Sequence, residues 1–130
     1  MLIGLKTLIM NFIIVRPNIT QEEFLNRLTE VFPEISDEVL DEDYAGLIHL
    51  QIACLARCAN QLIQHDRFDT LESVFRLFSD TVDEVDSLTE NALYVSFLEH
   101  IEMEGASAKA REARALLPPK HLTVWKALRQ

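Results

Sequence analysis

The sequence predicts an all-α protein: a single-domain irregular helical bundle of about six or seven helices, with antiparallel helical hairpins. Three observations favour this class. The 130 residues include only three glycines and four prolines, too few for a turn-rich β fold. Apolar residues recur at spacings of three and four in several segments, as on the buried face of a helix. Short polar connections separate these segments, and the length suits one domain with its own core.

The segment from residue 44 to 64 is expected to be the central helix. Arg57 is its only formal charge, and most of its circumference is apolar. Such a helix needs cover on more than one side, so the other segments are its packing partners. One arc of the helical wheel is instead small or polar, with Leu50 inside its edge, and contains Gly46, His49, Ala53, Ala56, Arg57, Asn60, Gln61 and Gln64.

Two elements are expected before the central helix. Thr20 and Glu23 match a capping box, so a helix begins after Thr20 and ends before Pro33, which disfavours helical geometry at the preceding residue. Ser36 then caps a short turn. The acidic residues 41–43 lead into the central helix, whose positive N-terminal end favours negative charge.

Four more helices are expected after the central one. The connection at residues 65–67 is short enough only for an antiparallel neighbour, and residues 68–82 carry the cleanest amphipathic pattern. A second capping box at Ser87–Glu90 predicts a helix that continues to about Met103. The last two helices are expected at residues 106–117 and around residues 122–128, separated by Pro118 and Pro119.

The formal net charge of −9 opposes nonspecific binding to nucleic acid or to anionic membranes. Negative charge is concentrated in residues 21–43 and 65–90, whereas the last 25 residues are mostly basic. Such a chain can pair its own ends in space, or it can present its basic end to a partner.

The two cysteines, Cys54 and Cys58, lie one helical turn apart. This geometry disfavours a disulfide between them, so reduced thiols and a cytoplasmic location are expected. The apolar segment 1–17 is too short to span a bilayer and lacks a signal-peptide cleavage pattern. It is expected to pack on the domain or to lie at an oligomer interface, although translation starting at Met10 would make part of it incidental.

A polar pocket on the central helix is the candidate site. His49, Arg57 and Asn60 could bind a small polar or anionic ligand, with Glu99 or His100 contributing from a later helix. The alternative is a solvated strip. No catalytic residue, metal site or cofactor is predicted, because the spacings lack CxxC, HExxH, Glu-x-x-His and a glycine-rich phosphate loop.

Three stretches carry a family resemblance: residues 24–33, residues 94–100, and Leu117-Pro118-Pro119 followed by Trp125. Together they resemble a group of small helical bacterial domains of unknown function, over residues 20–125. The resemblance implies a helical domain and brings no established catalytic residues. Small acidic immunity proteins, which neutralise toxins, are similar in general character.

The leading functional hypothesis is a non-enzymatic protein-interaction module, immunity-like or regulatory, that self-associates or binds another protein. The alternative is a small-ligand-binding protein or an enzyme that uses the polar pocket. A third hypothesis, a nucleic-acid-associated regulator using the basic C-terminal helices, has the overall charge against it. We therefore expect a homo-oligomer or a protein partner, no nucleic acid and no membrane, while a small molecule stays open.

Overall fold

The structure is a computed structural model that describes residues 18–130. Regular structure in this part is helical, apart from one isolated bridge between Ile19 and Val85. The predicted all-α class is therefore confirmed, while the apolar segment 1–17 lies outside the described residues. The α-helices of the described part are α2 (Gln21–Val31), α3 (Ser36–Val39), α4 (Ile48–Gln64), α5 (Phe68–Thr81), α6 (Ser87–Ala92), α7 (Ala108–Ala115) and α8 (Pro119–Leu128).

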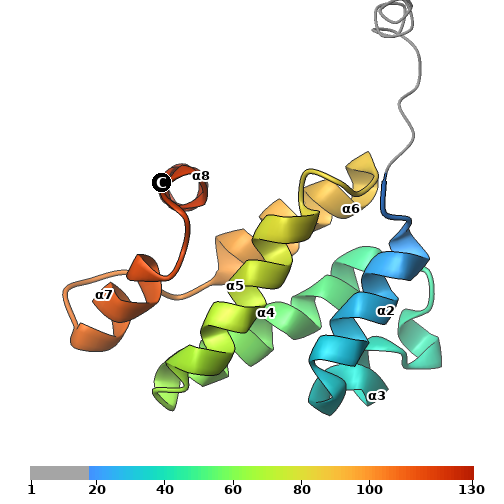
Figure 1. Cartoon of the computed structure of the whole chain (residues 1–130), viewed down its shortest axis with the longest axis horizontal. Helices are drawn as coiled ribbons and strands as arrows, with labels where there is room; N and C mark the ends of the chain where they lie inside the picture. The colour runs from blue at the N-terminus through green and yellow to red at the C-terminus, as the bar shows by residue number, and fades with distance from the viewer. Residues whose placement is uncertain (1–17) are drawn as a thin grey trace, which may run out of the picture.

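Helix α4 is the centre of the bundle (Figure 1). Helix α5 packs alongside it, with α2 and α3 toward one end and α7 and α8 toward the other. The buried side chains of α4 cover more than one side, which explains why a nearly uncharged helix is stable here. They are Ile48, Gln51, Ile52, Cys54, Leu55, Ala56, Ala59 and Ile63.

An aromatic cluster around Phe78 ties the later helices to α5. Its ring lies 5.4 Å from that of Phe97 and 5.9 Å from that of Tyr94, measured between centroids. The imidazole of His121 packs edge-on against the same ring at 4.9 Å. Edge-to-face contacts of this kind add to the hydrophobic gain from burying the rings, so one phenylalanine joins three elements of the core.

The capping box at the start of α2 is confirmed. Thr20 Oγ1 accepts from the Glu23 amide at 3.1 Å, and the Glu23 carboxylate accepts from the Thr20 amide at 2.9 Å. The bond from the Thr20 amide to the carboxylate, followed by the Thr20 side chain, lowers the pKa of Glu23. The second expected box is wrong by one residue, because Asp86 rather than Ser87 caps α6 and accepts from the Thr89 amide.

The central helix begins later than the sequence suggests. Residues 42–44 form a separate 3-10 turn, η4 (Glu42–Tyr44), and α4 starts only at Ile48. Gly46 between them has a φ of +77°. A glycine tolerates this left-handed conformation at little cost, so the chain turns there and does not continue as a helix.

The expected helix over residues 88–103 is interrupted. After α6 the backbone widens into a π-helical turn, η5 (Leu93–Phe97), and then tightens into a 3-10 turn, η6 (Leu98–His100). From Ile101 the chain is extended, and it turns at Gly105, which has a φ of +95°. The hydrophobic spacing alone was compatible with a continuous helix, and tertiary contacts decide otherwise.

The antiparallel α4–α5 hairpin forms as expected. Asp66 adopts a left-handed φ of 58°, and the Arg67 amide donates back to the Leu62 carbonyl at 2.8 Å. This arrangement is the Schellman motif, which ends a helix and satisfies its last carbonyl groups. Between residues 18 and 130, no helix combines the length and the apolar character needed to cross a membrane.

Candidate functional site

A hollow of about 260 Å³ opens beside the polar arc of α4. It is lined by Ala53, Ala56, Arg57 and Asn60 from α4, and by Ser96, His100 and Glu102 from the elements that follow α6. The structure therefore places three of the five predicted site residues, Arg57, Asn60 and His100, on one hollow. The small side chains of the two alanines leave the space that the sequence suggested.

Asn60 uses both ends of its amide to hold the backbone. Its Nδ2 donates to the His100 carbonyl at 2.9 Å, and its Oδ1 accepts from the Glu102 amide at 2.8 Å. The side chain thus pairs with the extended segment much as a neighbouring strand would. These bonds use one donor and one acceptor of the amide and fix its orientation, so Asn60 holds the wall of the hollow in place.

His49 does not line the hollow and instead contacts one of its lining residues. Its Nδ1 lies 2.6 Å from the hydroxyl oxygen of Ser96, which sits on the π-helical turn η5. Serine catalysis also needs a group that orients the imidazole and donors that stabilise the oxyanion. Among residues 18–130 the other ring nitrogen of His49 has no hydrogen-bond partner. The geometry supports a tertiary link between α4 and η5.

Glu99 lies on a different surface from the other predicted residues. It lines a second hollow of about 300 Å³ with Arg129 and Glu104, near the C-terminal end of the chain. Arg129 donates to the Glu99 carbonyl, pairs with the Glu104 carboxylate and stacks over the Trp125 ring. His100 lines both hollows, whereas Glu99 and Arg57 line separate ones.

Arg57 is paired within the chain. Its guanidinium donates to the Glu38 carboxylate at 2.7 Å, and this hydrogen bond raises its pKa. About half of each side chain is exposed to solvent, so the pair contributes little to stability. Glu38 keeps the guanidinium tied to α3, and a ligand in the hollow would have to compete with that carboxylate.

The thiols near Arg57 are poor nucleophiles. Burial, together with the nearby Glu38 carboxylate, raises the pKa of Cys54 to about 11. Burial and then Glu34 raise the pKa of Cys58 in the same direction. Both thiols are therefore protonated at neutral pH. Across residues 18–130 no three histidine, cysteine or carboxylate side chains gather in a geometry that could hold a metal ion.

The basic residues of the C-terminal helices are largely used inside the chain. Lys109 donates to the last carbonyl of α4 at Gln64, 2.6 Å away, and Lys120 lies 3.6 Å from the Asp83 carboxylate. Arg111, Arg114 and Arg129 donate to backbone carbonyl groups of the segment from Glu99 to Ala106. Of these contacts, only Lys120–Asp83 joins oppositely charged side chains, whereas the others bind backbone carbonyl groups.

Sequence reasoning missed three exposed leucines close to the start of α4 in the chain, which we call the leucine face: Leu40, Leu47 and Leu50. These side chains are 54%, 49% and 45% exposed. Leu47 and Leu50 lie one helical turn apart. The bond from Gln51 Nε2 to the Val39 carbonyl, 3.1 Å long, holds the residue before Leu40 against the same turn. The only feature of the sequence that indicated this exposure was the position of Leu50 inside the edge of the polar arc.

Exposed carboxylates precede the leucine face in the chain and flank Leu40. The turns and short helix that precede α4 carry six exposed acidic residues: Glu34, Asp37, Glu38, Asp41, Glu42 and Asp43. In the described part of the chain, Arg57 is the only cation that pairs with any of them. The start of α4 therefore combines exposed apolar surface with unbalanced negative charge.

Comparison with known proteins identifies a family but no characterised relative. The model of a family described as a domain of unknown function (DUF7674) matches residues 25–130. No curated protein and no solved structure matches the chain. The match covers all the helices from α3 to α8 and most of α2, in agreement with the resemblance to domains of unknown function. The chain belongs to the DUF7674 family.

Proposed function

We propose that this protein is a non-enzymatic interaction module whose leucine face docks a basic amphipathic helix of a partner protein. One observation carries the proposal: Leu40, Leu47 and Leu50 are each about half exposed beside a run of carboxylates. Grouped exposed apolar side chains with a polar rim are typical of protein-binding surfaces. Leucines on one turn of a helix suit the apolar stripe of a second helix.

The charge around the leucine face favours a basic partner. Six exposed carboxylates repel one another across a short stretch of chain, and lysine or arginine side chains flanking an apolar stripe would relieve that repulsion. Attraction of this kind speeds association and is screened by salt over a distance of about 8 Å at physiological ionic strength. The partner should therefore bind more slowly and more weakly as salt rises.

The chemistry of the described side chains supports a binding role over a catalytic one. The cysteine thiols have raised pKa values, and the His49–Ser96 pair has no orienting group within residues 18–130. Both cysteines are free thiols, which supports a reducing compartment such as the cytoplasm as the place of action.

A synthetic peptide tests the leucine face directly. The probe is an amphipathic helix of leucine and lysine, about 14 residues or roughly four turns long, with a leucine–glutamate peptide of the same pattern as its control. We expect fluorescence anisotropy to show binding of the lysine peptide only, with affinity falling as salt is raised. The double variant Leu47→Ser, Leu50→Ser should bind about tenfold more weakly or worse.

A matched control variant distinguishes binding at the leucine face from nonspecific hydrophobic binding. Leu88 is equally exposed, at 53%, on another part of the molecule, so Leu88→Ser should leave binding unchanged. Serine at position 47 occupies the N-cap of α4 and favours the helix, so the Leu47→Ser fold is retained. Equal affinity in the leucine-face and Leu88 variants would refute the proposal. A dimer that only the leucine-face variant dissociates would assign the surface to a second copy of the chain instead.

A further inference from the structure

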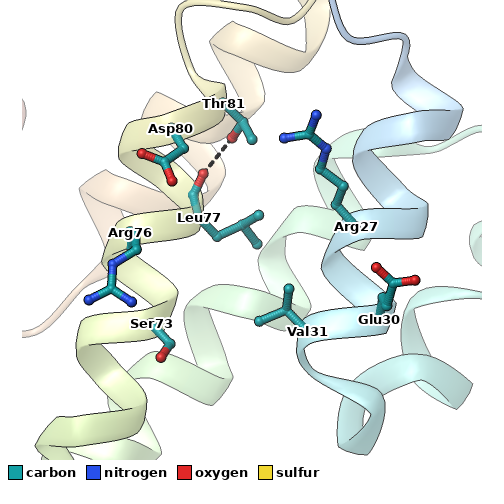
Figure 2. Close-up of a pocket in the computed structure, with 8 residues that line it drawn as sticks. All are labelled: Arg27, Glu30, Val31, Ser73, Arg76, Leu77, Asp80 and Thr81. Atoms are coloured by element: carbon teal, nitrogen blue, oxygen red, sulfur yellow. Dashed lines mark hydrogen bonds between the residues drawn. The ribbon is translucent and has the colours of Figure 1, made fainter.

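A hollow of about 400 Å³ lies between α2 and α5. Figure 2 shows the two helices as its walls, with the Val31 and Leu77 side chains between them. The carboxylates of Glu30 and Asp80 are turned away from this middle, so apolar side chains form it. Val31 is 48% exposed there. Within residues 18–130, the hollow therefore leaves apolar surface without cover.

The described part of the chain begins at one end of this hollow. The Ile19 amide donates to the Glu84 carbonyl at 2.9 Å, and the Asn18 side chain donates to the Glu84 carboxylate. The Glu84 amide in turn donates to the Thr81 carbonyl, 2.9 Å away, and Thr81 lines the hollow. The chain that precedes Asn18 is therefore tethered beside the C-terminal end of α5, at the edge of the hollow.

The sequence before this tether supplies an apolar occupant. Residues 12–15 read Phe-Ile-Ile-Val, and residues 1–17 contain no acidic side chain. Placing apolar side chains against apolar surface is favourable, because both are removed from water. A segment joined to its site by a short linker also has an effective concentration in the millimolar range. The chain's own residues 12–15 therefore have an advantage over a separate protein at this hollow.

The length of α2 matches the reach of these residues. Its 11 residues make it about 16 Å long, at a rise of 1.5 Å per residue. An extended chain spans that length with about five residues. Figure 1 shows α2 and α5 running in opposite directions, so a chain that returns from Asn18 along α2 follows both walls of the hollow. Such a path brings residues 12–15 to Val31 and Leu77.

We propose that residues 12–15 dock in the α2–α5 hollow and cover Val31 and Leu77. The chain's own N-terminal segment thereby closes the hollow and joins α2 to α5 along the length of α2. No residue that lines the hollow belongs to the leucine face. Either proposal can therefore fail without the other.

Nuclear Overhauser effects in the full-length protein test this contact directly. With the isoleucine, leucine and valine methyl groups labelled, we expect effects that join the methyl groups of Val31 and Leu77 to those of residues 13–15. The proposal is overturned if residues 13–15 show no such effect, or if their effects join them to the leucine face. Effects that appear only between two differently labelled copies would also overturn it, because the hollow would then hold the segment of a second chain.

A double-mutant cycle in urea unfolding measures the same contact through stability. One change replaces each of residues 12–15 by serine, and the other is Val31→Ala. We expect their effects on the equilibrium constant for unfolding to be coupled by about threefold or more, because both changes remove the same contact. Alanine also favours the helix at position 31, but this effect occurs on both sides of the cycle and cancels.

Leu88→Ala provides the matched control for the cycle. Leu88 is 53% exposed outside the hollow, so its effect should add to that of the serine changes without coupling. Additive effects of Val31→Ala and the serine changes would overturn the proposal. Coupling of equal size for Leu88→Ala would overturn it as well, because the segment would then act on the whole domain and not on the hollow.

Discussion

Asn60 is hydrogen-bonded to the backbone of His100, 40 residues further along the chain, with its Nδ2 2.9 Å from the carbonyl oxygen. The same side chain accepts from the Glu102 amide. Together the two bonds fix the place where the helical turns after α6 end and the chain becomes extended. The Trp125 indole nitrogen donates to the Ile101 carbonyl between them at 2.9 Å, so α4 and α8 hold this segment from both sides.

Replacing Asn60 should therefore destabilise the whole domain. Asn60→Ala removes a donor and an acceptor, and we expect the free energy of unfolding in urea to fall by about 1–3 kcal/mol, the net worth of two hydrogen bonds. Asn60→Asp keeps the acceptor for Glu102 but places an oxygen against the His100 carbonyl, so it should also destabilise. Asn91, exposed on α6, provides the control: an Asn91→Ala loss as large as that of Asn60→Ala would contradict the prediction.

The buried imidazole of His121 should make stability depend on pH. Burial, followed by the nearby Lys120, lowers its pKa, while Asp83 acts in the opposite direction. The folded state binds the proton less readily than the unfolded state does. The stability that the neutral imidazole contributes is therefore fully present above the unfolded pKa of about 6.5 and is lost as pH falls.

Unfolding curves at pH 7.5 and 5.5 test this dependence. His121→Gln cannot titrate and can still bond Ser79, whose hydroxyl lies 3.3 Å from His121 Nδ1. We expect the wild-type protein to lose stability between the two pH values and the variant to lose less. His65 is exposed, so His65→Gln should keep the wild-type slope. If His121→Gln and wild type share one slope, another group carries the pH dependence.

Replacing Gln51 by an ionisable residue should make stability fall as pH rises, which is opposite to the effect of His121. It is 3% exposed, its Nε2 bonds the Val39 carbonyl, and its Oε1 has no partner within the described residues. In Gln51→Glu, burial should raise the pKa of the new carboxyl, because the charged form is poorly solvated there. The variant should approach wild-type stability near pH 4 and lose several kcal/mol as pH rises through the raised pKa. A constant stability difference from wild type between pH 4 and 7 would show that the site is solvated.

Local signals predicted the local parts of the fold. Thr20 and Glu23 lie three residues apart, and their capping box formed as expected because both partners belong to one turn. The break after α6 could not be predicted, because Asn60 enforces it from α4 through contacts that no local pattern encodes. Likewise, the helical wheel placed His49 on the same arc as Arg57, but the contact of His49 with the Ser96 hydroxyl depends on tertiary packing.

The exposed leucines show the same limit at the candidate surface. A helical wheel ranks Leu47 with the core because it is apolar, yet its side chain is 49% exposed. Exposure depends on whether a neighbouring element covers that side, and the turn at Gly46 starts α4 with Leu47 at its N-cap. A sequence specifies apolar positions well, whereas uncovered ones emerge only from the assembled structure.

The left-handed residue at the end of α4 can be tested by comparing two substitutions. Asp66 holds a left-handed φ of 58° in the Schellman motif, a conformation that costs a residue with a Cβ roughly 1 kcal/mol and costs glycine almost nothing. Its carboxylate contributes little, since the nearest cation, Lys109, is 4.0 Å away and both side chains are about half exposed. Asp66→Gly should therefore be more stable than Asp66→Ala by about 1 kcal/mol in urea unfolding. Both variants remove the same carboxylate, so their difference isolates the backbone effect. Equal stability of the two would mean that the left-handed turn is not what ends α4.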